Sequence, residues 1–229
     1  MLVTVLRRSD YVTAMKVIVF GATGPTGRRA VDEALAKGHE VTGFVRDPSK
    51  LVKNHDRLKV VQGDALDPAS VEKALAGQEA VLVCLGARNR SGKGWPPRDI
   101  DFTATQNILA GMKKHGVKRL VCMSSAGVGD SKQVKSFFNL LFTKIIMPLL
   151  LKKVFDAKEK QEQAIRASDR EWIIVRPTWL NDDPARGAFK VTTDLTPVPG
   201  RISRGDVAAF MVAQLTSDQY LRKAPLIGG

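Results

Sequence analysis

The residues whose spacing most clearly suggests chemistry are three glycines in the stretch FGATGPTG, at residues 20–27. Gly21, Gly24 and Gly27 recur at every third position, after an apolar run and before a helical pattern. Such a turn lets backbone N–H groups and a helix N-terminus approach a pyrophosphate, which predicts a dinucleotide site. The alternative is a turn with a purely structural role. The other members of the predicted site in this turn are Thr23, Pro25 and Thr26.

The end of the next apolar run, VTGFVRDPSK, bears on which dinucleotide binds. In dinucleotide-binding folds an acidic residue there accepts from the ribose of NAD, whereas an arginine suits the 2′-phosphate of NADP. Arg46 takes this position, and Ser49 and Lys50 follow it. The sequence therefore predicts NADP (NADPH) as the cofactor. Asp47 argues against this, and we expect it to point away or to cap the next segment; the alternative is a solvated Arg–Asp pair on a loop.

The elements that must position these residues alternate along the chain. Near-continuous apolar runs predict strands, and amphipathic stretches between them predict helices. This alternation predicts an α/β fold of the Rossmann type, a doubly wound parallel sheet with helices on both faces, in which ligands bind at the carboxyl ends of the strands. The predicted strands are 16–22, 39–46, 58–64, 79–87, 117–127 and 171–180, and the predicted helices are 27–38, 67–77, 98–116, 154–168 and 203–217.

Length and pattern predict a single domain over 15–229, preceded by an extension at 1–14. Within the domain, we expect the segments at about 87–100, 130–155 and 178–202 to lie on the substrate side.

Further candidates follow the later strands. Asp64 can accept from an adenine amino group, with Ala65 against the ring, although a loop cap is the alternative role for Asp64. Trp179 can stack on a flat acceptor or lie in the core. The remaining predicted cofactor contacts at these strand ends are Leu85, Gly86, Ala87, Ser124, Pro177 and Thr178.

Composition narrows the classes of function. The chain has 229 residues and a net charge of +13, from 36 Lys and Arg against 23 Asp and Glu. Such a charge raises the question of nucleic acid, but the sequence has no helix-turn-helix, zinc-finger or RNP pattern and only 6% aromatic residues. We expect no nucleic-acid partner, and attribute the charge to a basic surface or to attraction of an anionic cofactor or acidic substrate.

Other features bear on location and assembly. Cys84 and Cys122 lie in apolar runs, which predicts buried free thiols in a reducing, cytoplasmic setting. No histidine has the spacing of a metal ligand, so we expect no metal. Lys144 and Pro148 interrupt the apolar stretch 137–155 well short of a membrane span, so it is either an exposed amphipathic patch or a partner surface. We expect a monomer or a homodimer.

The chain resembles the atypical short-chain dehydrogenase/reductases. FGATGPTG, VRDPSKL, GDALD, LGARN, MSSAG and WIIVRP occur in that family's order and spacing. Within the family it is most similar to the flavin reductase/biliverdin-IXβ reductase group, to which ISRGDVAAFM also points. The resemblance implies an NAD(P)H-dependent oxidoreductase.

The same resemblance locates the catalytic positions. The family's proton relay combines Ser, Tyr and Lys, in which Tyr donates a proton to a carbonyl oxygen. Ser125 and Lys158 match the serine and lysine positions, but Val154 occupies the tyrosine position. Ser125 is alternatively a strand-end hydroxyl bonded to backbone. Lys158 and Glu162 are alternatively an i,i+4 surface pair.

The resemblance to a group that lacks this tyrosine implies hydride transfer to a flat conjugated acceptor, such as a flavin, quinone or bilin. The rival function is a non-catalytic NADP-binding redox sensor that acts through a protein partner. An epimerase or dehydratase is a third, weaker alternative, because such enzymes usually keep the tyrosine.

Overall fold

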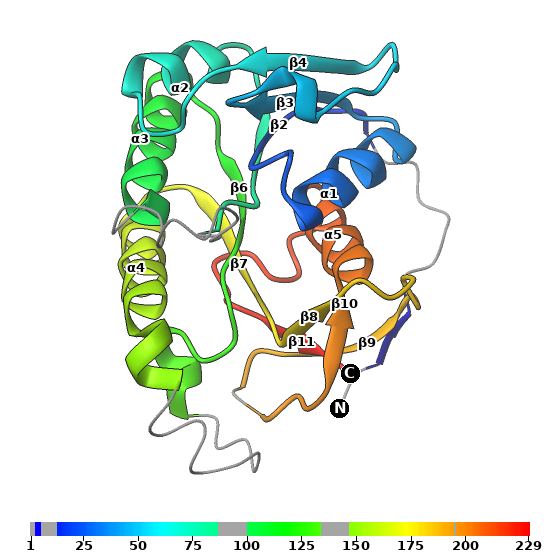
Figure 1. Ribbon diagram of the computed structural model, residues 1–229, viewed down its shortest axis with the longest axis vertical. Helices are drawn as coiled ribbons and strands as arrows, with labels where there is room; N and C mark the ends of the chain where they lie inside the picture. The colour runs from blue at the N-terminus through cyan, green and yellow to red at the C-terminus, as the bar shows by residue number, and fades with distance from the viewer. Residues whose placement is uncertain (1–2, 6–12, 87–99, 134–146, 195) are drawn as a thin grey trace.

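A nine-stranded sheet forms the centre of the molecule, as a computed structural model of the chain shows (Figure 1). The structure describes residues 3–5, 13–86, 100–133, 147–194 and 196–229. Seven neighbouring strands run parallel, in the order β4-β3-β2-β5-β6-β7-β11. Their bounds are Leu58–Gln62 (β4), Glu40–Val45 (β3), Lys16–Phe20 (β2), Ala80–Val83 (β5), Arg119–Met123 (β6), Glu171–Pro177 (β7) and Leu226–Gly228 (β11). The predicted doubly wound parallel sheet is therefore confirmed.

Two antiparallel strands extend this sheet beyond β11. They are β9 (Ala188–Thr192) and, at the edge, β1 (Val3–Val5). A separate two-stranded parallel sheet is formed by β8 (Trp179–Asn181) and β10 (Arg201–Ser203). Part of the segment before Met15 thus pairs with the sheet, while the domain boundary at residue 14 stays a prediction.

Helices cover both faces of the sheet (Figure 1). Helices α1 (Pro25–Ala36) and α5 (Arg204–Ala213) pack together on one face, and α2 (Pro68–Leu75), α3 (Ile100–Lys114) and α4 (Met147–Ala167) on the other. Alternate side chains of β2 supply the two cores: Val17 and Val19 pack with α1 and α5, and Ile18 and Phe20 pack with α2 and α3. A strand buried on both faces therefore has to be apolar at every position, as the sequence is.

Helix ends largely follow their sequence signals. Asp67 accepts from the Ala69 N–H and caps α2, and Ser203 accepts from the Asp206 N–H and caps α5; both residue types are favoured at helix starts. Helix α4 begins at Met147, seven residues before the predicted start, and Pro148 lies in its first turn, where no intrahelical N–H is required.

Three strand predictions were clearly wrong in extent. The strand predicted over 79–87 ends at Val83, and the strand predicted over 117–127 ends at Met123. The strand predicted over 171–180 is divided at Thr178 into β7 and β8. The short strands β1, β9, β10 and β11 were not predicted, since three to five residues carry too little periodicity to identify.

One polar contact beside the sheet predicts a pH dependence of stability. The buried His39 Nδ1 accepts from the Met15 N–H at 3.2 Å, which requires a neutral ring. Burial, and secondarily Lys37, lower the pKa of His39 below its ordinary value of 6.5. Because the folded pKa is the lower one, this contribution to stability is complete above about pH 6.5 and is lost as pH falls below it, by about 1.4 kcal/mol per unit until the folded pKa is reached.

We expect chemical denaturation between pH 7.5 and 5 to show this loss, and His39→Asn to reduce it, because the amide oxygen can accept from Met15 without titrating. Parallel losses in the two proteins would contradict a neutral His39.

Candidate active site

The glycine turn lies where the strand order reverses, between β2 and β5. Gly21 adopts φ +82°, and a Cβ on it would lie 2.6 Å from the Cys84 carbonyl oxygen. A Cβ on Gly27 would lie 2.1 Å from the Gly21 carbonyl oxygen. Neither position therefore accepts a larger residue without backbone movement. This is the point at which doubly wound sheets bind nucleotides.

The start of α1 is open to an anion. Gly24 precedes the helix, no side chain caps it, and Pro25 occupies the first turn, which contains no acidic residue. The N–H groups of Thr26 and Gly27 have no intrahelical acceptor at this position. Thr26 is buried and Thr23 is half-buried beside the turn. The donors and the helix dipole suit a pyrophosphate, so the residues present fit the predicted cofactor.

The residues predicted to bind the 2′-phosphate of NADP follow β3. Asp47 caps the short helix η1 (Pro48–Lys50), accepting from the Ser49 N–H at 3.1 Å and from its hydroxyl at 2.6 Å. Lys50 Nζ lies 2.8 Å from Asp47 Oδ2, and this contact, with Ser49, lowers the pKa of Asp47. Arg46 is exposed and makes no ion pair within the described residues. Asp47 is thus a cap, as expected, and Arg46 is the cation at this strand end that has no acid partner there.

The adenine-side candidates show mainly structural contacts. Asp64 is exposed, and its Oδ1 accepts from the Leu66 N–H at 3.0 Å, which is the loop-cap role. Ala65 is half-buried, and its carbonyl accepts from Asn107 Nδ2. Leu85 is half-buried and Gly86 exposed after β5. Ala87 lies outside the described residues.

The strand-end serines differ from each other. Ser125 Oγ donates to the Ala126 carbonyl at 3.1 Å, which is the backbone-bonded alternative. Ser124 is buried, and its N–H donates to the Val175 carbonyl at 2.7 Å. Its hydroxyl has no hydrogen-bond partner in the described part of the chain. Ser124 is thus the serine whose hydroxyl is available to form a hydrogen bond with a ligand.

Lys158 points inward from α4. It is 8% exposed, and its Nζ lies 3.5 Å from Oδ2 of Asp101, which is 2% exposed on α3. Neither the ammonium nor the carboxylate has a hydrogen bond among the residues described. The surface-pair alternative for Lys158 and Glu162 is wrong, because Glu162 is buried and bonds to Arg176 instead.

Asp101 is a candidate site residue that the sequence analysis missed. An acidic residue in the first turn of a helix is ordinarily explained by the helix dipole. The available signal was its place on an apolar flank, between Ile100 and Phe102, just after the predicted substrate-side loop.

The two cysteines lie at the ends of the central strands. Both are buried and free, as predicted. Burial raises the pKa of Cys84 to about 12 and also raises that of Cys122, while the charge of Lys158 acts on both in the opposite direction. The thiols therefore stay protonated.

The residues after β7 border the same edge. The Ala126 N–H donates to the Pro177 carbonyl, so the ends of β6 and β7 are tied together. Thr178 Oγ1 is buried without a hydrogen-bond partner within the described ranges. Trp179 is 63% exposed, which overturns the alternative that it belongs to the core. Val154 lies in α4, one turn before Lys158, as the relay positions require.

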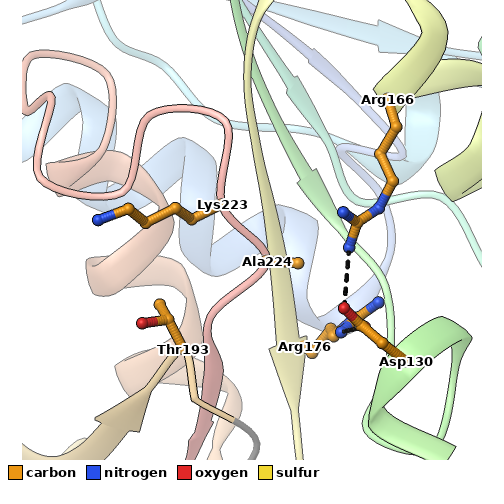
Figure 2. A pocket seen from close by; sticks show the side chains of 6 residues that line it. All are labelled: Asp130, Arg166, Arg176, Thr193, Lys223 and Ala224. Atoms are coloured by element: carbon orange, nitrogen blue, oxygen red, sulfur yellow. Dashed lines mark hydrogen bonds and ion pairs between the residues drawn. The ribbon is translucent and has the colours of Figure 1, made fainter.

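A cleft of the described structure lies elsewhere (Figure 2). It measures about 280 Å³ and is lined by Asp130, Arg166, Arg176, Thr193, Lys223 and Ala224. Figure 2 shows Arg166 and Asp130 facing each other, with Arg176 beside Asp130. Arg176 is buried and also bonds to Glu162, with Nη2 to Oε2 at 2.5 Å. None of the predicted site residues lines this cleft.

The described residues contain neither a metal-binding cluster nor a membrane-spanning helix. No group of three His, Cys, Asp or Glu side chains there is placed to hold a metal ion. In the same residues, no helix has the length and apolar character needed to cross a membrane.

Comparison with known proteins decides the family. Residues 21–218 match the family described as NAD(P)H-binding. The chain belongs to the NAD(P)H-binding family. This membership confirms the predicted NAD(P)H cofactor and agrees with the geometry of the glycine turn.

Two curated relatives come from Arabidopsis thaliana. An uncharacterized chloroplast protein is 29% identical over 217 residues, which cover 91% of this chain and 74% of that protein. The chloroplast divinyl chlorophyllide a 8-vinyl-reductase is 28% identical over 240 residues, covering 94% of this chain and 53% of that enzyme. The chain thus spans about half the length of this second relative.

Solved structures show the same fold. A short-chain dehydrogenase/reductase from Veillonella parvula, solved in complex with NADP, has a TM-score of 0.75 at 18% identity, covering 95% of each chain. ChuY of Escherichia coli O157:H7, described as an anaerobilin reductase, has a TM-score of 0.76 at 22% identity, covering 93% of this chain and 96% of that one. The family match confirms the predicted oxidoreductase class and the resemblance on which it was based.

The Asp101–Lys158 contact predicts a selective effect on cofactor binding. In the family that the chain resembles, the relay lysine holds the nicotinamide ribose, and Lys158 matches its position. Asp101→Asn should therefore weaken NADPH binding about tenfold by releasing the ammonium from its carboxylate partner. Binding of adenosine 2′,5′-bisphosphate, which lacks that ribose, should not change. Calorimetry on both ligands measures this, and equal weakening of both would reduce Asp101 to a structural role.

Proposed function

We propose that the protein is an NADPH-dependent reductase that transfers hydride to a flat, conjugated acceptor without a tyrosine proton donor. The observation that carries the proposal is the exposed indole of Trp179 at the carboxyl edge of the sheet, directly after the end of β7. Exposing most of a tryptophan forgoes burial worth about 2 kcal/mol or more, so an exposed indole at a ligand-binding edge suggests a stacking surface.

Three features of the fold support the proposed cofactor position. The start of α1 suits the pyrophosphate, and Arg46 is available for a 2′-phosphate. Ser124, Lys158 and Thr178 lie at the other end of that path, with buried polar atoms that have no hydrogen bond in the described portion. A nicotinamide riboside supplies hydroxyl and amide groups that would form hydrogen bonds with these polar atoms. When bound, the reduced nicotinamide supplies the hydride.

The acceptor class is supported by what the site lacks. The tyrosine position of the relay is Val154, and Tyr220 is buried against Phe210, far from the carboxyl edge. The Ser125 hydroxyl donates a hydrogen bond to the Ala126 carbonyl. An acceptor that spreads charge over its rings can receive the hydride first and take a proton from water. The printed names of two similar proteins, a divinyl chlorophyllide reductase and an anaerobilin reductase, agree with such a class.

The test is turnover. We expect the purified protein to oxidise NADPH in the presence of FMN, followed at the nicotinamide absorbance band, and to do so at least about tenfold faster than NADH at low cofactor concentration, because a charge-assisted phosphate contact is worth about 1.5–3 kcal/mol. Tight NADPH binding with no turnover of FMN, a quinone or a bilin would contradict the reductase proposal.

That second outcome would favour the rival function, a non-catalytic NADP-binding redox sensor. The observation that favours the redox sensor is Val154 at the tyrosine position. Most of the apolar stretch proposed as its partner surface, 137–155, lies outside the described residues. The cytoplasmic location and the monomer or homodimer also stay predictions.

The cofactor preference has its own test. Arg46→Ala should raise the KM for NADPH about tenfold and leave that for NADH unchanged, since only NADPH carries the 2′-phosphate. Lys50→Ala is the matched control and should have a smaller effect, because Lys50 is paired with Asp47. An equal effect of Arg46→Ala on both cofactors would mean that Arg46 does not read the phosphate.

A further inference from the structure

The small sheet of β8 and β10 brings Trp179 and an arginine together. In its parallel register Trp179 pairs with Arg201, Leu180 with Ile202 and Asn181 with Ser203. Paired residues of neighbouring strands project to the same face. Leu180 and Ile202 pack into the core with α1 and α5, so Trp179 and Arg201 project away from it.

A cleft of about 230 Å³ continues this outer face. Asn181, Ser203 and Arg201 line it together with Arg186. Gly229 lines the cleft as well. The two side-chain carboxylates of the cleft are already engaged: Asp206 accepts from the N–H groups of Arg186 and Gly187 and from the Ser203 hydroxyl, and Asp183 accepts from Asn181.

The guanidinium groups are not engaged in this way. Arg201 and Arg186 are exposed, and neither makes an ion pair with any described residue. The cleft therefore offers cations, together with carboxylates whose charge is already bound by backbone N–H and side-chain donors.

We propose that Trp179 and Arg201 form an acceptor subsite that selects flat acceptors bearing an acid group. The indole stacks on the ring system, and the guanidinium binds a phosphate or carboxylate on its substituent. The inference rests on the proposed function, since it names the substrate class of the same site.

The connection to the reacting edge is short. The Pro177 carbonyl is bonded to the Ala126 N–H, and Trp179 follows two residues later. The Thr178 N–H donates to the Ile227 carbonyl, which fixes the chain between them. A ring on Trp179 therefore lies beside the place that Ser124 and Thr178 give to the nicotinamide. An acid group reaching outward meets Arg201 on the neighbouring strand.

A pair of flavins tests the subsite, because FMN and riboflavin share one ring system and differ by a phosphate. Binding to the NADP complex is followed by quenching of flavin fluorescence, and reduction by NADPH oxidation. We expect the wild-type protein to prefer FMN about tenfold, and Arg201→Ala to abolish that preference by weakening FMN alone. Trp179→Ala should weaken both flavins to the same degree, and Trp179→Phe should restore most of the loss.

Lys223→Ala is the control for net charge, because it removes one exposed cation from the other cleft, and it should leave the FMN preference intact. Equal binding of the two flavins by the wild-type protein, or equal weakening of both by Arg201→Ala, would overturn the subsite. FMN-selective binding without reduction would leave the subsite standing and refute the reductase. Reduction of both flavins at equal rates would support the reductase and refute the subsite. Absence of both binding and reduction would refute both proposals.

Discussion

The constraint on which much of the structure depends is a ladder of ion pairs along α4, buried at Lys158 and Glu162 and exposed at Arg166. Lys158, Glu162 and Arg166 recur at every fourth residue and face, in turn, Asp101 on α3, Arg176 on β7 and Asp130 in the short helix η2 (Gly129–Gln133). Charges removed from water are tolerated only when each has a partner, so a shift of α4 by one residue would leave several unpaired. The ladder therefore fixes the register of α4 against two neighbours, which apolar packing alone specifies less strictly.

This register determines where the functional groups lie. Arg176 directly precedes Pro177, so anchoring its side chain to Glu162 also anchors the end of β7 from which Trp179 projects. Gly129 adopts φ +58°, and a Cβ on it would lie 2.6 Å from Arg176 Nη2, so only glycine allows η2 to close over the pair. The cleft in Figure 2 is then best understood as the solvent-facing side of a structural ion network.

The sequence predicted what local chemistry determines. The glycine turn, the caps at Asp67 and Ser203, the cap at Asp47 and the alternating apolar strands each depend on a few neighbouring residues. The features that escaped prediction depend on tertiary contacts. Lys158 and Glu162 have the i,i+4 spacing that is common in exposed helix pairs. Their burial depends on the partners that the tertiary fold supplies on α3 and β7. The pairing of Trp179 with Arg201 joins residues 22 positions apart through strands too short to identify from the sequence.

The buried polar atoms at the carboxyl edge give the site its chemical character. Ser124 Oγ, Thr178 Oγ1 and the Lys158 and Asp101 groups are buried without hydrogen bonds inside the described ranges, at a cost of about 1–3 kcal/mol for each neutral group. The proposed function assigns these atoms to the nicotinamide end of the cofactor. The described side chains at that edge include no tyrosine, which agrees with the proposal that the edge holds and orients a donor rather than protonates a product. The proposed acceptors are those whose own rings stabilise the charge that hydride transfer delivers.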